Sequence, residues 1–399
     1  MKNGNILISG ASIAGPALAY WLHRYGFNPT IVERAPALRE GGYKIDIRGA
    51  AVDVAARMGI LADIRQHSTG MRATTFVNRA GKRLATMDAD LFGGRTAGDV
   101  EIMRGDLAHL LYEATWQNTE YIFDDSITSI AQHEAGVDVA FAHSPPRRFD
   151  LIVGADGLHS NVRTLAFGAE SEFIQHLNHY IAIYSIPNYL HLDRWELMHA
   201  VPGKTAGIYS THQSSTAKAM FIFAAPPLEY DRRDSAQQKQ ILAETFATEG
   251  WEVPQMLKHM AAAPDFYFDS ISQVRMNRWS NGRTVLVGDA AYGPSPASGQ
   301  GTSLALVGAY VLAGELAAAE DEHTALCSYE REMRPFVEQN QRLAPENLKG
   351  MVLRSRPQIW FQTQMIRLLP HLPGKDKIIG RIADAIHSAA AAITLKEYL

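Results

Sequence analysis

Glycines, carboxylates and arginines gather in four short segments where apolar runs of the chain end. The first segment is Gly10-Ala11-Ser12-Ile13-Ala14-Gly15, which precedes a helical pattern. In a dinucleotide-binding turn, such glycines permit a tight bend and let a pyrophosphate approach the backbone closely. The phosphates then meet free N–H groups at a helix N-terminus, where the helix dipole favours anions. Ser12 stands where the middle glycine is usual, which weakens the motif.

Glu33 ends the second apolar run, near the spacing at which a carboxylate accepts hydrogen bonds from ribose hydroxyls. An acidic residue at this position suits FAD or NAD better than a nucleotide with a 2′-phosphate. These residues alone leave two alternatives open. One is a nicotinamide dehydrogenase without flavin, and the other is a glycine-rich turn in an unrelated α/β protein.

Two further segments are weaker signals when each is taken alone. The Arg104 guanidinium has several N–H donors that suit a phosphate or a flavin-linked oxygen. The alternative is an ordinary arginine at the protein surface. Asp156-Gly157 follows the apolar run Leu151–Val153, and ligands of α/β sheets bind beyond the carboxyl ends of strands. The alternative for Asp156 is an ordinary strand-to-helix turn.

The fourth segment favours a flavin. Gly288-Asp289 ends an apolar run, and Gly299-Gln300-Gly301 then leads into a long apolar helix. The Asp289 carboxylate is suited to accept hydrogen bonds from the hydroxyls of a ribityl chain. The positive end of the helix would stabilise the negative charge of a reduced flavin ring. The sequence therefore predicts bound FAD.

The order of elements predicts an α/β protein with a Rossmann-like FAD-binding domain and an inserted mixed-sheet substrate domain. The first domain is expected to hold a helix from Pro16 to about Tyr25 and strands at Asn5–Ser9, Pro29–Val32, Asp150–Val153 and Thr284–Val287. The inserted sheet is expected at His179–Ile186, Lys204–Tyr209 and Lys218–Ala224, with helical cover from Asp231 to Met260. The predicted FAD-binding parts are 1–75, 101–175 and 273–337, and the substrate parts are 76–100 and 176–272.

C-terminal helices are predicted from about Glu332, with 338–399 bridging the two domains. Prolines are expected to divide this tail into pieces at Pro335, Pro345, Pro357, Pro370 and Pro373. Residues 376–394 carry isoleucines at helical spacing, which predicts an amphipathic helix. Its mixed charges favour docking on the protein's own body over docking on a membrane surface.

Composition excludes several classes of protein. The 399-residue chain has a formal net charge of −4 and no long basic run, so nucleic acid is not an expected partner. Cys327 is the one cysteine, so no internal disulfide can form, which fits the cytoplasm. The run Leu304–Ala319 contains Glu315 and is short for a membrane span, so it is expected to be a buried helix. The histidines show no metal-ligand spacing.

The four segments, in this order, resemble the class A flavoprotein monooxygenases, which share the fold of para-hydroxybenzoate hydroxylase. The resemblance covers Ile6 to about Phe336. A narrower similarity is to the tetracycline-inactivating monooxygenases, the tetracycline destructases of soil and Legionella type. It rests on Tyr20-Trp21-Leu22, Asp46-Ile47-Arg48-Gly49, Ile186-Pro187-Asn188-Tyr189-Leu190 and Ser295-Pro296-x-Ser298-Gly299-Gln300-Gly301.

The resemblance implies a chemistry and a set of cofactor contacts. NADPH would reduce FAD, O₂ would add at the flavin C4a, and the hydroperoxide would transfer one oxygen atom to a polycyclic phenolic substrate such as a tetracycline. Arg39 would serve NADPH. The enzyme is expected to be a monomer with no catalytic side chain beyond the flavin. The residues predicted to bind FAD are Gly10, Ser12, Ala14, Gly15, Glu33, Arg34, Asp46, Arg104, Asp156, Asp289, Pro296, Gly299, Gly301 and Thr302.

The chain departs from the family pattern near the presumed flavin ring. Tyr292 replaces a common histidine, and Thr302-Ser303 replaces the common x-Asn. A polycyclic substrate is expected between side chains of the inserted sheet, with core packing as the alternative for each. The predicted substrate wall is Tyr209, His212, Phe221 and Phe223. Other functions that remain open are hydroxylation of another aromatic natural product and drug binding by a retained flavin without turnover.

Overall fold

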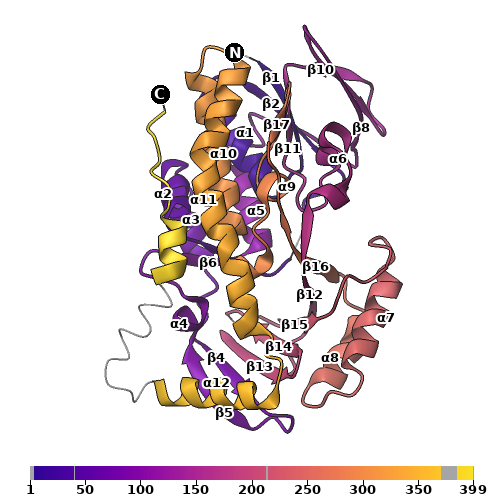
Figure 1. The fold of residues 1–399 in the computed structure, drawn as a ribbon, viewed down its shortest axis with the longest axis vertical. Coiled ribbons are helices and arrows are strands. Elements are labelled where there is room, and N and C mark those ends of the chain that lie inside the picture. The colour runs from indigo at the N-terminus through magenta and orange to yellow at the C-terminus, as the bar shows by residue number, and fades with distance from the viewer. Residues whose placement is uncertain (1–3, 40, 213, 370–383, 399) are drawn as a thin grey trace.

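The computed structural model describes residues 4–39, 41–212, 214–369 and 384–398. A six-stranded sheet forms one end of the molecule (Figure 1). Its order is β17-β18-β11-β1-β2-β7, and all neighbours are parallel except β17 and β18. The strands are β1 (Asn5–Ser9), β2 (Asn28–Glu33), β7 (Glu120–Phe123), β11 (Leu151–Gly154), β17 (Ser280–Asn281) and β18 (Thr284–Leu286). The strands predicted at β1, β2, β11 and β18 are therefore confirmed.

Helices cover this sheet and complete the first hydrophobic core. They are α1 (Ala14–Arg24), α2 (Ala50–Arg57), α3 (Leu61–Gln66), α5 (Arg104–Glu113), α6 (Asn161–Phe167) and α10 (Gly301–Ala318). Of the described helices, α10 alone is long and apolar enough to cross a membrane, but most of it lies inside the protein. The expectation of a buried helix here is confirmed.

A seven-stranded mixed sheet forms the other end, in the order β16-β12-β15-β14-β13-β4-β5. Neighbouring strands are antiparallel except β13 and β4, which are parallel. The helices α7 (Ser235–Phe246) and α8 (Val253–Met260) cover one face of it. The strands are β4 (Ala73–Val77), β5 (Arg83–Asp88), β12 (Ile174–Pro187), β13 (Trp195–Val201), β14 (Lys204–Ser210), β15 (Thr216–Ala224) and β16 (Tyr267–Val274). The α/β class with an inserted mixed sheet is thus confirmed, while the domain boundaries stay a prediction.

Smaller elements complete the fold. The strands β3 (Lys44–Ile47) and β6 (Val100–Met103) form an antiparallel pair. A separate three-stranded sheet contains β8 (Ile127–His133), β9 (Gly136–Phe141) and β10 (Arg147–Phe149). The short helices are α4 (Ala89–Gly93), η1 (Glu170–Glu172), α9 (Asp289–Tyr292) and η2 (Pro296–Ser298).

The prediction that prolines divide the tail was wrong at Pro335 and Pro345. Both lie inside α11 (Glu322–Met351), one continuous 30-residue helix. A proline removes one backbone hydrogen bond from a helix. Here packing at both ends outweighs that loss, because Phe336 belongs to the core of the first sheet and Leu348 packs on the second. The helix thus bridges both ends of the molecule (Figure 1).

After α11, Pro357 stands in the first turn of α12 (Arg356–Leu368), where a proline is tolerated. Pro370, Pro373 and much of the predicted terminal helix fall outside the described residues. Residues 384–390 are helical and the chain is irregular beyond them, so the predicted end at 394 was too late. This segment docks on the protein's own body, since the Ala389 carbonyl accepts a hydrogen bond from Asn340 Nδ2 at 2.8 Å.

Candidate functional site

The first glycine-rich turn is closely packed at the carboxyl end of β1. Gly10 has a φ of 110°, and a Cβ added there would lie 2.6 Å from the Ala155 carbonyl oxygen. A Cβ at Gly15 would lie 1.9 Å from the Gly10 carbonyl oxygen. Both positions therefore require glycine. Ala14 in turn lies against Gly288, so the first and fourth segments meet here, while the Ser12 side chain stays partly exposed.

Glu33 is held facing this turn. One carboxylate oxygen accepts the Ala11 N–H at 2.9 Å, and the other accepts the Ala35 N–H at 2.9 Å. Each carboxylate oxygen keeps a lone pair, so both remain able to accept ribose hydroxyls. Arg39 lies 3.8 Å from Glu33 and is largely exposed. Arg34 is exposed.

Arg104 and Asp289 approach each other from segments far apart in the sequence. Asp289 follows β18. Solvent reaches this residue, although many protein atoms lie around its carboxylate. Burial raises the pKa of the Asp289 carboxyl, and the Arg104 guanidinium partly offsets this rise. The same two charges act on the hydroxyl of Tyr43, whose pKa is raised by burial, opposed by Arg104 and raised further by Asp289. Arg104, Asp289 and Tyr43 therefore lie close enough for their charges to interact.

The start of α10 lies beside Asp289. Pro296 and Gly299 are exposed and Gly301 is partly exposed, whereas Thr302 is buried. A Cβ added at Gly301 would lie 3.6 Å from Asp289 Oδ1. The first N–H groups of a helix lack internal partners, and its dipole adds positive potential. An anionic ring edge placed here would be stabilised.

Two residues predicted to bind the cofactor are occupied by protein groups. Asp156 caps α6, because its carboxylate accepts the Asn161 N–H at 2.9 Å and the Val162 N–H at 3.1 Å. This matches an ordinary strand-to-helix turn. Asp46 pairs with Arg48 at 2.7 Å and with Arg95 at 3.2 Å. FAD contacts from Asp156 and Asp46 stay predictions.

Two side chains that depart from the family pattern, Tyr292 and Ser303, are buried. The Tyr292 side chain is buried, and its hydroxyl accepts a hydrogen bond from the Tyr329 hydroxyl at 3.0 Å. A Cβ at Gly308 of α10 would lie 1.9 Å from the Tyr292 hydroxyl. The expected position of Tyr292 beside the ring was therefore wrong, because its side chain points into the core. The Ser303 hydroxyl is also buried, where it accepts the Arg48 N–H at 3.1 Å.

The predicted substrate wall is divided between the two faces of the seven-stranded sheet. Tyr209 lies on the inner face, toward the first sheet, where its hydroxyl accepts the Lys44 N–H at 3.3 Å. Phe221 and Phe223 lie on the outer face, fully buried under α7 and α8. Their placement in a wall was wrong, because side chains of one strand alternate between faces and these two have no free surface. His212 is exposed in a loop and lies 3.4 Å from Asp193.

The inner face carries groups that the sequence reasoning missed. Lys218 Nζ donates to Asp265 Oδ2 at 2.6 Å and to Ser185 Oγ at 2.8 Å. Met220 and Tyr267 flank Ile183 in the next row across the sheet. The available signal was Lys218 within an otherwise apolar strand, in phase with Met220 and out of phase with the phenylalanines.

Aromatic and charged groups connect this face to the cofactor segments. The ring of Tyr267 lies 6.0 Å from that of Tyr43. The Tyr43 carbonyl accepts the Arg104 N–H at 3.0 Å. Tyr267 also donates to Asp269, which contacts His159 Nε2 at 3.0 Å. The inner face, Arg104 and Asp289 thus form one candidate site.

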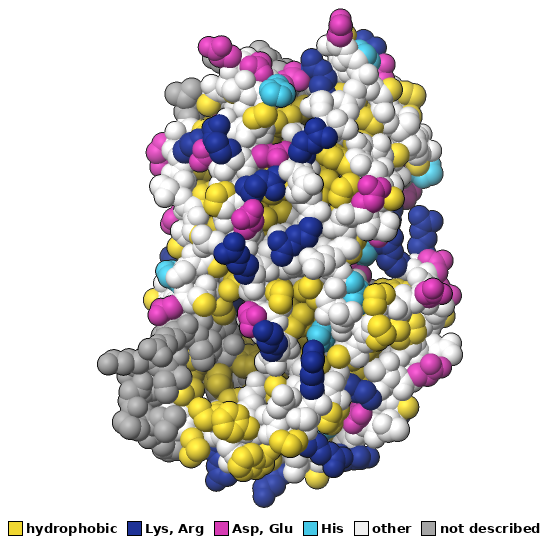
Figure 2. Space-filling view, in the orientation of Figure 1, with side chains coloured by type: hydrophobic (Ala, Val, Ile, Leu, Met, Phe, Trp, Pro, Cys, Tyr) yellow, Lys and Arg dark blue, Asp and Glu magenta, His cyan; other side chains and the backbone are white. Residues whose placement is uncertain are grey.

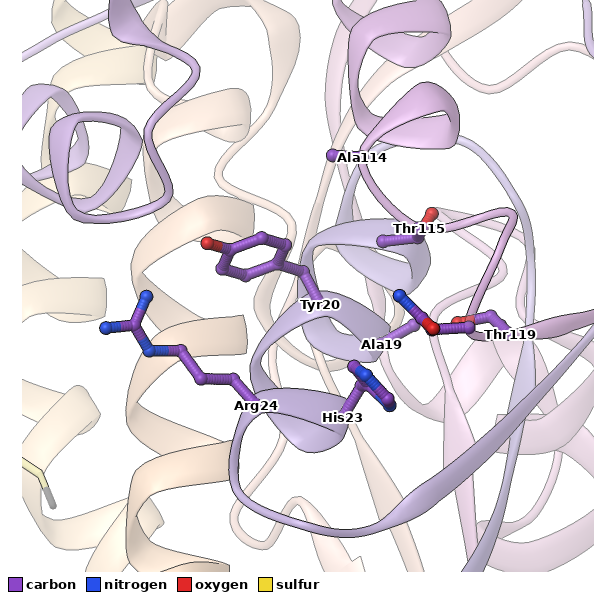
Figure 3. A pocket seen from close by; sticks show the side chains of 8 residues that line it. Ala19, Tyr20, His23, Arg24, Ala114, Thr115 and Thr119 are labelled. Carbon is purple, nitrogen blue, oxygen red and sulfur yellow. The ribbon is translucent and has the colours of Figure 1, made fainter.

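A separate surface pocket does not belong to this site (Figure 3). It lies at the C-terminal end of α1, whereas the glycine-rich turn lies at the N-terminal end, about 16 Å away for a helix of this length. It contains none of the predicted site residues. Its lining residues are Ala19, Tyr20, His23, Arg24, Ala114, Thr115, Asn118 and Thr119.

Comparison with known proteins gives matches over most of the chain. A sequence profile described as an FAD binding domain matches residues 4–344. An uncharacterised protein of Mycobacterium tuberculosis is 47% identical over 348 residues, which cover 86% of this chain and 94% of that protein. A flavin-dependent monooxygenase of Legionella longbeachae is 42% identical, covering 86% and 88%. The solved structure of the tetracycline destructase Tet(55) is 39% identical with a TM-score of 0.86, and both chains are fully covered.

Proposed function

The chain belongs to the FAD-binding domain family of flavin-dependent monooxygenases, and from this premise we propose its reductant and its substrate. The reductant is NADPH. The substrate is a polycyclic phenolic compound of the tetracycline type, which receives one oxygen atom of O₂. The observation that carries the proposal is the convergence of Arg104, Asp289, the start of α10 and the inner face of the seven-stranded sheet.

The residues present fit FAD. Gly10 and Gly15 leave no room for a Cβ, which is the tight packing that a dinucleotide-binding turn requires. Glu33 retains acceptor capacity for ribose, and Asp289 has an accessible carboxylate for ribityl hydroxyls. FAD supplies the hydride acceptor and the reaction with O₂ that this protein's side chains cannot supply.

The side chains of the chain bind, orient and shield. The N-terminus of α10 would stabilise negative charge that develops on a flavin bound beside it. Arg104 offers a second positive charge beside Asp289. The inner face of the sheet excludes water from the reacting atoms. We assign Arg39 to NADPH, since its guanidinium is largely exposed beside Glu33.

The chemistry of the inner face supports a polycyclic phenol as the substrate. Met220, Tyr43 and Tyr267 offer apolar and aromatic surface to a flat ring system. The Lys218–Asp265 pair offers polar groups to ring oxygens at the edge, whereas the buried Tyr209 hydroxyl holds the Lys44 backbone. Similarity to Tet(55), a tetracycline destructase, supports tetracyclines within this class.

Incubation of the FAD-loaded protein with NADPH, O₂ and tetracycline tests the substrate. We expect loss of the drug's absorbance together with drug-dependent oxidation of NADPH. Drug binding without NADPH turnover would indicate a flavin-retaining binding protein instead. Turnover of other aromatic compounds but not of tetracyclines would indicate a hydroxylase of another natural product.

The Asp289→Ala variant tests the cofactor site. The variant is expected to lose most of its bound FAD, because a carboxylate acceptor for the ribityl chain is removed. The matched control is Asp63→Ala, which removes an exposed carboxylate on α3. Flavin content per protein, read from absorbance after gel filtration, should fall in Asp289→Ala alone. Full flavin content in Asp289→Ala would contradict the assignment.

A further inference from the structure

The helix α12 presents large apolar side chains to solvent on the side that faces away from the protein. They are Trp360, Phe361, Leu368 and Met365, with exposures of 64%, 60%, 50% and 38%. The opposite side of the helix carries the buried residues Thr363 and Ile366, where α12 packs along β5. An ordinary surface helix places polar residues on its outer side. The packing of the folded protein therefore does not explain why apolar residues occupy the solvent-facing side of α12.

The four side chains form one stripe and not scattered exposures. Phe361, Met365 and Leu368 are spaced four and three residues apart, which places them on one side of a helix. Trp360 is also exposed and projects about 100° away from Phe361 around the helix, so it borders this row. Contiguous exposed apolar surface of this kind commonly marks an interaction site.

The charges around the stripe are all positive. Arg354, Arg356 and Arg367 are exposed, and no acidic residue occurs between positions 347 and 369. Within the part of the chain that the structure describes, these three arginines form no ion pair. Arg83 at the start of β5 adds a further exposed cation beside the exposed Leu84. This local charge is opposite in sign to the net charge of −4 for the whole chain.

The space-filling view agrees with this arrangement. Figure 2 shows hydrophobic side chains gathered along the lower edge of the molecule, where Figure 1 places α12 and β5. Lys and Arg side chains border them on that edge, with few Asp and Glu side chains among them.

We propose that the outer side of α12 docks this monooxygenase onto an anionic membrane surface. Tryptophan favours the membrane–water interface, and an apolar helix side enters the boundary between headgroups and acyl chains. Arginines at both ends of the stripe attract anionic headgroups. In a two-fold dimer through this stripe, the same arginines of both copies would face one another and repel, which favours an anionic lipid surface over a second copy of this chain.

Co-sedimentation of the full-length, FAD-loaded enzyme with sucrose-loaded vesicles tests the proposal. Binding is expected to mixed phosphatidylcholine–phosphatidylglycerol vesicles and to be much weaker with phosphatidylcholine alone. It should also weaken at about 1 M salt, where the Debye length falls to about 3 Å. Equal binding to both lipid compositions, or binding to neither, would overturn the proposal.

Variants then assign the binding to α12. The double variant Trp360→Ser/Phe361→Ser should lower the partition coefficient by about tenfold or more, because it removes the two most exposed apolar side chains. Arg356→Gln and Arg367→Gln should each lower it by about fivefold. The matched control is Trp116→Ser, which removes a tryptophan that is 51% exposed elsewhere on the surface. Flavin content verifies that each variant is folded.

Two results would contradict an assignment to α12. The first is that the double variant binds vesicles as well as the unchanged enzyme. The second is that sedimentation velocity shows a concentration-dependent dimer which the double variant abolishes, since the stripe would then contact a second copy.

Discussion

The two faces of the seven-stranded sheet differ in chemistry although they belong to the same strands. On the outer face, Phe221 contacts Phe246 of α7 with ring centroids 4.8 Å apart, and the neighbours are apolar. On the inner face, Lys218 pairs with Asp265, and Tyr209 contacts the backbone of Lys44. The outer face holds the sheet together. The inner face carries the polar groups that a substrate can use.

This difference shows which residues of a strand are better candidates for a binding site. A row of aromatic residues at alternate positions in β15 resembles a ligand wall, but it is a core row. The residues in the other phase, Lys218 and Met220, face the cofactor segments. A charged side chain in a strand of this kind is costly to bury without a partner. Its presence is therefore the more informative signal.

The largest expected effect on stability comes from the outer face. Phe221→Ala should lower the free energy of unfolding by about 3–5 kcal/mol, because it removes a buried aromatic ring and leaves a cavity. The measurement is chemical denaturation. The folded fraction should keep its flavin and its KM for substrate. Normal stability with a raised KM would place Phe221 in the substrate wall after all.

The second effect is a pH dependence that belongs to the inner face. Burial raises the pKa of Asp269 to about 6. Because the folded state then holds this proton more tightly than the unfolded state, the free energy of unfolding falls as the pH rises from about 4 to about 6. The fall is at most about 3 kcal/mol for two pKa units.

Asp269→Asn should remove this fall in denaturation experiments across that pH range. Phe221→Ala is the comparison, since it should lower stability equally at both ends of the range. An unchanged slope in Asp269→Asn would show that Asp269 is not the titrating group.

The third effect concerns the ion pair of the inner face. Lys218→Met leaves Asp265 without its partner, which should cost about 1–2 kcal/mol because the pair is only partly buried. KM should rise while flavin content stays constant. Lys239→Met on α7 is the matched control, since that lysine lies on the outer side and is partly exposed. Equal KM values for the two variants would argue against a substrate role for Lys218.

The smallest effect is expected from Tyr209→Phe. The variant loses one hydrogen bond, from the Lys44 N–H to the hydroxyl, worth about 0.5–1.5 kcal/mol. Thermal denaturation would measure the shift in stability, and steady-state kinetics would measure a modest rise in KM. A loss of flavin in this variant would show that Tyr209 supports the cofactor and not the substrate.

Local patterns predicted the fold better than they predicted the substrate face. The apolar runs at β1, β11 and β18 identified their strands, because each is buried and short. Pro335 and Pro345 led to a wrong prediction. A proline weakens a helix only locally, whereas the packing of α11 on two cores stabilises it over its whole length. Tyr292 misled in the same way, because only the fold shows that it points at Gly308.

The candidate site was predictable where backbone geometry fixes the residue type. Gly10, Gly15 and Asp289 stand out because a turn or a strand end requires them. Lys218, Asp265 and Tyr43 come from three separate segments, and their proximity depends on the pairing of distant strands. The spacing of these residues along the chain does not predict that they lie close together.

Mass spectrometry of the product formed from tetracycline, NADPH and ¹⁸O₂ tests the central claim most directly. If the inner face holds a polycyclic phenol for oxygenation, the product gains one oxygen atom and that atom carries the label. An unchanged drug mass, with FAD bound and NADPH consumed, would contradict the account.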